Sequence, residues 1–144
     1  MFKLQIKYLS FFFGIVSILS FFNILYSYYF NLYLNLDTYY FTLIASSILF
    51  ITFFKFGKYD IKSNIFQRIL TIFLGYLLIP LVLSIPFYFS IYNLTFSNSF
   101  FEAISGFTST GFTIFENIKL IDQSLIIWRS TTQWIGGLYF LFSI

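Results

Sequence analysis

The stretch from Leu9 to Phe30 contains 22 residues without a single charge. As an α-helix it would be about 33 Å long, at a rise of ~1.5 Å per residue, which is enough to cross the hydrocarbon core of a bilayer. Two further uncharged stretches run from Tyr39 to Phe54 and from Ile69 to Tyr92. Only 9% of the chain is charged and 59% is apolar, too few polar groups to cover a soluble fold. The sequence therefore predicts an all-α membrane protein, because helices satisfy their own backbone hydrogen bonds in lipid.

The first stretch is preceded by Lys3 and Lys7, a pattern that also occurs in cleaved signal peptides. The stretch is too long for the apolar core of a signal peptide, and no A-x-A-like cleavage site follows it. We therefore expect a retained helix. In the third stretch, Pro80 and Pro86 each remove a backbone donor, which favours a kink. A last apolar stretch, Ser124 to Ile144, is expected to form another spanning helix.

Charged residues are divided unequally between the two sides that these helices define. One set sums to +5 and the other to −3, with Arg129 counted separately inside the last stretch. Because cytoplasmic loops carry an excess of Lys and Arg, we expect a multi-pass protein of the inner (cytoplasmic) membrane whose N-terminus is cytoplasmic. The basic set is Lys3, Lys7, Lys55, Lys58, Lys62 and Arg68 with Asp60, and the acidic set is Asp37, Glu102, Glu116 and Asp122 with Lys119.

Histidine and cysteine are absent from the sequence. The chain therefore lacks the commonest general base and metal ligand, as well as disulfides and thiolate metal sites. Ser109 lies between Gly106 and Gly111, as a nucleophilic serine can, but there is no histidine to activate it, and nothing in the spacing supports Lys119 as a substitute base. We expect no enzyme activity and no cofactor, and the net charge of +3 does not indicate a nucleic-acid partner.

Residues 93–123 are rich in Ser, Thr, Asn and Gly but too apolar for an ordinary external loop. Within them, Ser97 to Gly106 can form a short helix. Ser97 or Ser99 would be its N-cap, and Ser99 with Glu102 fits a capping box. We expect Gly106 to end this helix.

The residues that follow, Thr108, Ser109, Thr110, Gly111 and Phe112, are candidates for a pore-lining loop. A short helix that ends at mid-membrane directs the negative end of its dipole toward them, which favours a cation. Extended backbone after such a helix can turn its carbonyl oxygens toward an axis, where they replace the hydration shell of a potassium ion. Glycine fits because backbone beside an ion path often needs φ > 0. Taken alone, these residues favour an external turn, so the assignment depends on context.

Two motifs supply that context. The first is FEAISGFTSTGF at residues 101–112, and the second is WRSTTQWIGGL at residues 128–138, about 16 residues further on. Together and in this order they closely resemble the first pore repeat of the Trk/Ktr/HKT potassium transporter superfamily, most of all its TrkH branch. The resemblance is strong over residues 97–138 and loose over the upstream apolar stretches.

The resemblance implies a fold in which two leading transmembrane helices precede four helix–pore-loop–helix repeats around one pathway. Residues 1–62 would hold the leading helices, and residues 63–144 would be the first pore repeat, truncated at its C-terminus. Residues 108–112 would bind potassium, or alternatively sodium, through their backbone as one strand of a selectivity filter. Two positions depart from the family pattern, Ser109 where Thr is common and Tyr139 where Gly is common.

The function implied by this resemblance is potassium uptake across the cytoplasmic membrane. The implied partners are the lipid bilayer, the remaining pore repeats or other copies of the chain, and a cytoplasmic nucleotide-binding regulatory subunit. Because the chain holds one filter strand and stops at Ile144 inside an apolar stretch, we expect a truncated or split product that does not transport alone. The alternatives are a homotetrameric channel-like protein and a non-conducting membrane scaffold or accessory subunit.

A charge inside a membrane segment is costly and marks a candidate functional residue. Arg129 lies about one turn into the last apolar stretch. Our hypothesis is that it pairs with Glu102 and supports the filter loop from behind; the alternative is that Arg129 snorkels to the outer headgroups. We expect Trp128 and Trp134 to be interface and packing residues. The pair Gly136-Gly137 is expected to allow close helix approach.

Overall fold

The structure, a computed structural model, describes residues 6–57 and 64–143. Over these residues the chain forms six α-helices and one 3-10 turn, with no strand, which confirms the predicted all-α membrane class. The predicted boundary at residues 62 and 63 lies outside the described residues, as do Lys3, Lys58, Asp60, Lys62 and Ile144. The elements are α1 (Ile6–Tyr29), α2 (Leu36–Phe56), α3 (Ile65–Leu83), α4 (Ile85–Tyr88), α5 (Phe96–Phe107), η1 (Ile118–Leu120) and α6 (Gln123–Ser143).

Three helical stretches of the described chain are long and apolar enough to cross a membrane, Lys7–Tyr29, Leu36–Phe56 and Ile65–Tyr88. They correspond to the three predicted stretches. The third begins earlier than predicted because Asn64 and Gln67 form a capping box at its start. Helix α6 has 21 residues but is not among the three. The polar residues 129–133 interrupt its apolar sequence and lower its hydropathy, so the expectation that this helix also spans the membrane stays a prediction.

The two prolines of the third span lie on either side of a helix interruption. Helix α3 continues through Pro80 to Leu83, and the interruption falls at Ser84. The Ser84 hydroxyl donates to the carbonyl of Leu81 at 2.7 Å. Pro86 then lies in the first turn of α4, where a missing N–H costs nothing. The predicted kink is therefore a break between two helices, placed before Pro86 and not at Pro80.

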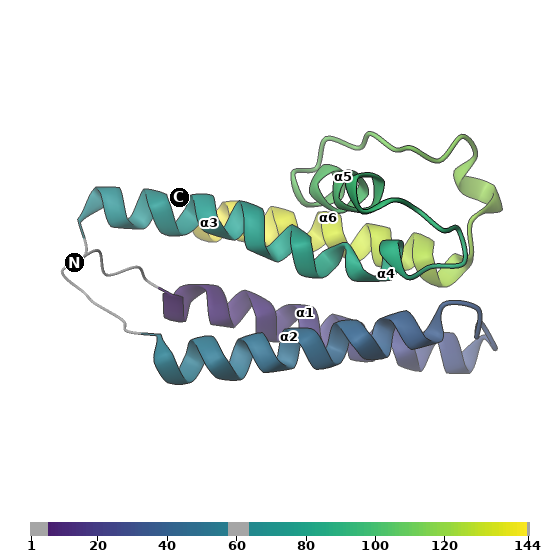
Figure 1. The fold of residues 1–144 in the computed structure, drawn as a ribbon, viewed down its shortest axis with the longest axis horizontal. Helices are drawn as coiled ribbons and strands as arrows, with labels where there is room; N and C mark the ends of the chain where they lie inside the picture. The colour runs from purple at the N-terminus through teal and green to yellow at the C-terminus, as the bar shows by residue number, and fades with distance from the viewer. Residues whose placement is uncertain (1–5, 58–63, 144) are drawn as a thin grey trace.

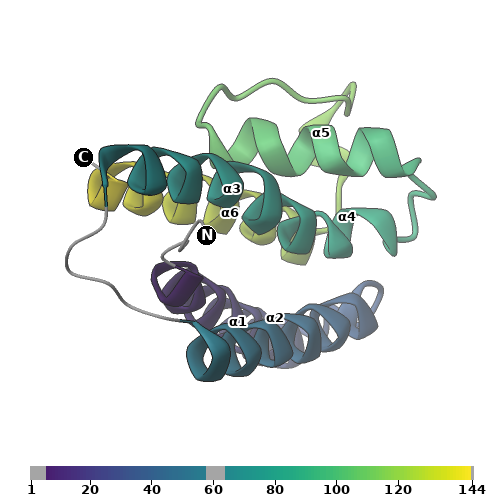
Figure 2. The same ribbon diagram turned by 60° about the vertical axis from the view of Figure 1, so that its left-hand side comes forward.

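The helices are arranged in three layers (Figures 1 and 2). Helices α1 and α2 form an antiparallel hairpin. Helices α3 and α6 lie together across it, joined by the bonds from Tyr139 to Ile72 and from Trp128 to Leu83. Helix α5 covers the opposite face of the α3–α6 pair, and the chain after it loops back over α5 before it enters α6 (Figure 2). This arrangement leaves α5 and its following loop away from the leading hairpin.

The middle of the fold is packed around Tyr139, which is fully buried. The centroid of its ring lies 4.7 Å from that of Phe12 and 5.1 Å from that of Tyr76, and its hydroxyl donates to the carbonyl of Ile72 at 3.0 Å. Gly75 on α3 makes room for it, because a Cβ there would lie 1.8 Å from the Tyr139 oxygen. The tyrosine that departs from the family pattern is thus accommodated by a glycine on the facing helix.

Replacing Tyr139 by Phe is expected to lower the free energy of unfolding by about 1 kcal/mol, because one buried hydrogen bond is lost while the ring contacts stay. Thermal unfolding of the purified chain in detergent measures this change. Phe142→Leu on the same helix, at a side chain that is 60% exposed, is the control and should change little. An unchanged midpoint for Tyr139→Phe would contradict a stabilising role for the hydroxyl.

The two tryptophans of α6 have different environments. Trp128 is fully buried and its indole N–H donates to the carbonyl of Leu83 at 3.0 Å. Trp134 is 60% exposed on the outer side of the helix. Trp128 therefore packs inside the protein. Trp134 is exposed on the protein surface, where an interface residue would lie.

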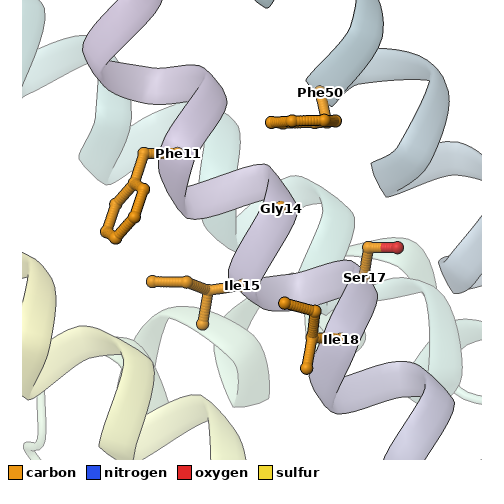
Figure 3. Close-up of a pocket in the computed structure, with 6 residues that line it drawn as sticks. All are labelled: Phe11, Gly14, Ile15, Ser17, Ile18 and Phe50. Atoms are coloured by element: carbon orange, nitrogen blue, oxygen red, sulfur yellow. The ribbon is translucent and has the colours of Figure 1, made fainter.

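A shallow apolar groove of about 310 Å³ lies on the face of the leading hairpin (Figure 3). Its only polar lining side chain, Ser17, is bonded to the Ser47 hydroxyl of α2 at 2.8 Å. The groove therefore offers no unsatisfied polar side chain of its own. Its lining residues are Phe11, Gly14, Ile15, Ser17, Ile18 and Phe50.

Candidate functional site

The N-terminus of α5 is capped differently from the prediction. Thr95 is the N-cap, and its hydroxyl oxygen accepts from the backbone N–H three residues on, at 3.3 Å. The Ser99 hydroxyl instead donates to the Thr95 carbonyl at 3.0 Å. The predicted caps Ser97 and Ser99 and the capping box with Glu102 are therefore wrong. Extended backbone at Thr95, with φ −65° and ψ 156°, starts the helix earlier, and the Glu102 carboxylate binds elsewhere.

The C-terminal end of α5 is closed by the segment that follows it. The helix ends at Phe107, one residue beyond the predicted Gly106. Its last carbonyls accept from the backbone N–H groups of the next three residues. These bonds are Thr108 to Ile104 at 2.8 Å, Ser109 to Gly106 at 2.9 Å and Thr110 to Ser105 at 3.1 Å. The N–H groups of residues 108–110 therefore all point back toward the helix.

The backbone of residues 108–112 alternates in handedness. Ser109 has a φ of 57° and Gly111 a φ of 79°, whereas φ at the intervening Thr110 is not positive. Such alternation turns successive peptide planes the same way, with N–H groups on one side and carbonyls on the other. In the part of the chain that the structure describes, no hydrogen bond reaches the carbonyl oxygens of residues 108–110. All five residues are exposed, so these unbonded carbonyls belong to an open segment.

Glu102 lies on α5 behind this segment, and its side chain is completely buried. Its carboxylate accepts from the Thr113 hydroxyl at 2.6 Å and from the Ile114 backbone N–H at 2.6 Å. The guanidinium of Arg129 donates to its other oxygen at 3.1 Å. A buried carboxylate requires such partners because an uncompensated charge is expensive in this environment. Glu102 therefore fixes the chain just beyond Phe112 to α5.

Arg129 reaches from α6 to the same segment. Besides its bond to Glu102, its Nη2 donates to the carbonyls of Gly111 and Phe112, each at 3.3 Å. Its side chain is only 13% exposed, so it does not extend toward headgroups. The structure thus brings together all seven predicted site residues, with Glu102 and Arg129 bonded to the end of the segment at residues 111–114.

Two further residues of this site were not predicted. The Ser105 hydroxyl donates to the Phe112 carbonyl at 2.6 Å and lies 3.1 Å from the Thr110 hydroxyl, and Thr113 binds Glu102. Ser105 follows Glu102 by three residues and therefore shares its helix face. That spacing is a sequence signal for Ser105. No comparable pattern marks Thr113, whose position depends on how the loop turns.

A hollow of about 340 Å³ adjoins the start of the segment. It lies where α5 ends against α6, and a Cβ at Gly136 would lie 1.7 Å from the Phe107 carbonyl oxygen. A Cβ at Gly137 would meet no atom within 4 Å. The prediction of close helix approach is therefore confirmed for Gly136 and wrong for Gly137. The lining residues are Tyr76, Phe107, Thr108, Ser109, Gly136, Gly137 and Phe140.

Comparison with known proteins finds transporters. The chain is 36% identical over 64 residues, 44% of its length, to an uncharacterised cation transporter of Methanocaldococcus jannaschii. It is 38% identical over 60 residues (42%) to the Trk system potassium uptake protein TrkI of Halomonas elongata. It is 33% identical over 82 residues (56%) to the Trk system potassium uptake protein TrkH of Escherichia coli. These matches span only 14%, 11% and 17% of the respective relatives. No family model matches the chain, and no solved structure matches it.

Proposed function

We propose, on the premise that this chain is a Trk-like membrane protein, that residues 108–112 form one strand of a potassium-selective filter. The observation that supports this most directly is the division of backbone groups at residues 108–110. Their N–H groups are bonded to the end of α5, while their unbonded carbonyl oxygens belong to an open segment. Carbonyl oxygens arranged in this way can replace the hydration shell of a potassium ion.

The end of α5 adds to this preference for a cation. A helix carries partial negative charge at its C-terminus, and α5 ends at Phe107 directly before the strand. Arg129 does not oppose the cation, because its charge is compensated by Glu102 and it approaches the strand at Gly111 and Phe112 only. The strand therefore keeps free carbonyl oxygens at residues 108–110 and receives its cationic support at residues 111 and 112.

One strand does not surround an ion, and a filter of this kind needs four. We propose that the remaining strands come from further pore repeats or other copies of the chain, placed against the open carbonyls of residues 108–110. The function of that assembly would be potassium uptake across the cytoplasmic membrane. The chain alone would not transport.

The distribution of charge supports an orientation in the membrane. Lys55 lies in the last turn of α2. That end of α2 meets the start of α1, because a Cβ at Gly57 would lie 2.8 Å from the backbone nitrogen of Lys7. The acidic residues Asp37 and Asp122 lie at the other end, near Asn35. By the positive-inside rule the lysine end is cytoplasmic, and a nucleotide-binding regulatory subunit would bind there.

Replacing Gly111 by Ala tests the filter assignment. The new Cβ would meet no atom within 4 Å, so the change acts through backbone strain at a φ of 79°, which costs ~1–2 kcal/mol for an L-residue. We expect the preference for potassium over sodium to fall about tenfold. Gly111→Asn should have a smaller effect, because asparagine tolerates the left-handed region.

Ion selectivity can be measured only when the remaining filter strands are present. A chimaera in which residues 64–143 replace the matching stretch of E. coli TrkH supplies them, and ion uptake is measured in cells that lack their own potassium uptake systems. Leu120→Ala, at a loop side chain that is 79% exposed, is the control. An active chimaera whose selectivity is unaltered by Gly111→Ala would reject the filter assignment and favour a non-conducting scaffold.

A further inference from the structure

The side chain of Asn35 joins three parts of the chain that are far apart in sequence. Its Oδ1 accepts from the backbone N–H of Ile91 at 3.1 Å. Its Nδ2 donates to the carboxylate of Asp122 at 3.0 Å. Asn35 lies in the turn between α1 and α2 and is only 1% exposed. One buried amide thus bonds the leading hairpin to both the chain before α5 and the chain before α6.

This use of Asn35 is unusual for its position. Asn35 is the N-cap of α2, where an asparagine side chain ordinarily accepts from the first backbone N–H groups of its own helix. Here it makes no such bond. Both functional groups of the amide are instead used for partners 56 and 87 residues away.

The two ends that Asn35 joins also contact each other directly. The Tyr92 hydroxyl accepts from the backbone N–H of Asp122 at 2.8 Å. Residues 91 and 122 are the first and last residues of a segment, here called the excursion, that contains α5 and the strand 108–112. The excursion is therefore closed at its base, with the Asn35 amide and the Tyr92 hydroxyl as the two closing groups.

A second set of bonds holds the same end of α6 to the leading helices. The Ser124 hydroxyl donates to the Asp122 carboxylate and lies 2.9 Å from the Tyr39 hydroxyl of α2. The Asn23 side chain of α1 donates to the Ser124 carbonyl at 3.3 Å. Both leading helices thus contact the point where the excursion ends.

We propose that Asn35 is a positioning residue that fixes the base of the excursion, residues 91–122, to the leading hairpin. Pinning both ends of a long segment removes conformational freedom that its own short helix cannot remove. The bond to Asp122 is the stronger of the two because its acceptor is charged. Through these bonds of Asn35, the leading hairpin positions the strand 108–112. The positioning role of Asn35 does not depend on the proposed function. Only the identification of residues 108–112 as a filter strand does.

Amide hydrogen exchange of the full chain in detergent micelles tests this without any ion measurement. In Asn35→Leu we expect exchange at residues 91 and 122 to become about 10- to 100-fold faster, the change that follows from losing a buried hydrogen bond to a charged group. Exchange within residues 9–20 of α1, away from the contact of Asn23 with Ser124, should stay unchanged. Asn98→Ala, which removes an exposed amide from α5, is the control and should leave all rates unchanged.

A reciprocal exchange separates positioning from a general packing role. Asn35→Asp keeps the acceptor for Ile91 but places two carboxylates together, so exchange at residue 122 should accelerate. Adding Asp122→Asn restores a donor and acceptor pair, and the double variant should return toward the parent rate. Unchanged exchange at the base in Asn35→Leu, equal acceleration along the whole chain, or no recovery in the double variant would each overturn the proposal. Gly111→Ala could still alter selectivity in that case, so the two proposals fail separately.

Discussion

Replacing Gly136 by Ala is expected to destabilise the protein by about 3 kcal/mol, at the upper end of the usual cost of inserting a methyl group into a packed contact. The added Cβ would lie 1.7 Å from the carbonyl oxygen and 2.5 Å from the carbonyl carbon of Phe107. Both are backbone atoms and cannot rotate away. Helix α5 must therefore move away from α6, and the strand that begins at Thr108 must move with it.

The neighbouring Gly137 provides a matched control. The same substitution there meets nothing within 4 Å, and alanine is a better helix former than glycine by up to ~1 kcal/mol. Gly137→Ala should therefore be neutral or slightly stabilising. Unfolding midpoints of the two variants, measured by thermal melting in detergent, give the comparison. Equal midpoints would contradict the close contact between α5 and α6.

These two glycines also show the limit of what the sequence predicts. Their motif predicted close approach for both, but which one faces α5 depends on the rotation of α6 about its axis. That rotation is fixed by contacts with other helices, such as the bond from Trp128 to Leu83. A local pattern does not contain this information.

The same distinction explains the other outcomes. The three spans were predictable because a run of apolar residues is a local property, and the approach of Glu102 to Arg129 was predictable because two charges in an apolar setting need partners. Asn35 was not identified, since its partners are 56 and 87 residues away. The N-cap was misplaced because serine and threonine at several neighbouring positions fit a cap equally well.

The other large effect is expected at the pair of Glu102 and Arg129. Glu102 is fully buried and Arg129 is 13% exposed, so removing one partner leaves a poorly solvated charge. We expect Glu102→Gln and Arg129→Gln each to destabilise the protein by about 3–5 kcal/mol. The double variant should lose much less than the sum, because neither charge then remains unpaired. Unfolding free energies of the four proteins, measured in detergent, complete the cycle, and additive losses would reject the pairing.

Arg129→Lys separates the ion pair from the support of the strand. Lysine keeps the charge but lacks the planar fork that lets Arg129 bind Glu102 through Nε and the carbonyls of Gly111 and Phe112 through Nη2. We therefore expect Arg129→Lys to recover part of the stability lost in Arg129→Gln, while hydrogen exchange around residues 111–114 stays faster than in the parent chain. If lysine restored both, the bonds to the two carbonyls would contribute nothing. The role of Arg129 would then be limited to compensating the charge of Glu102.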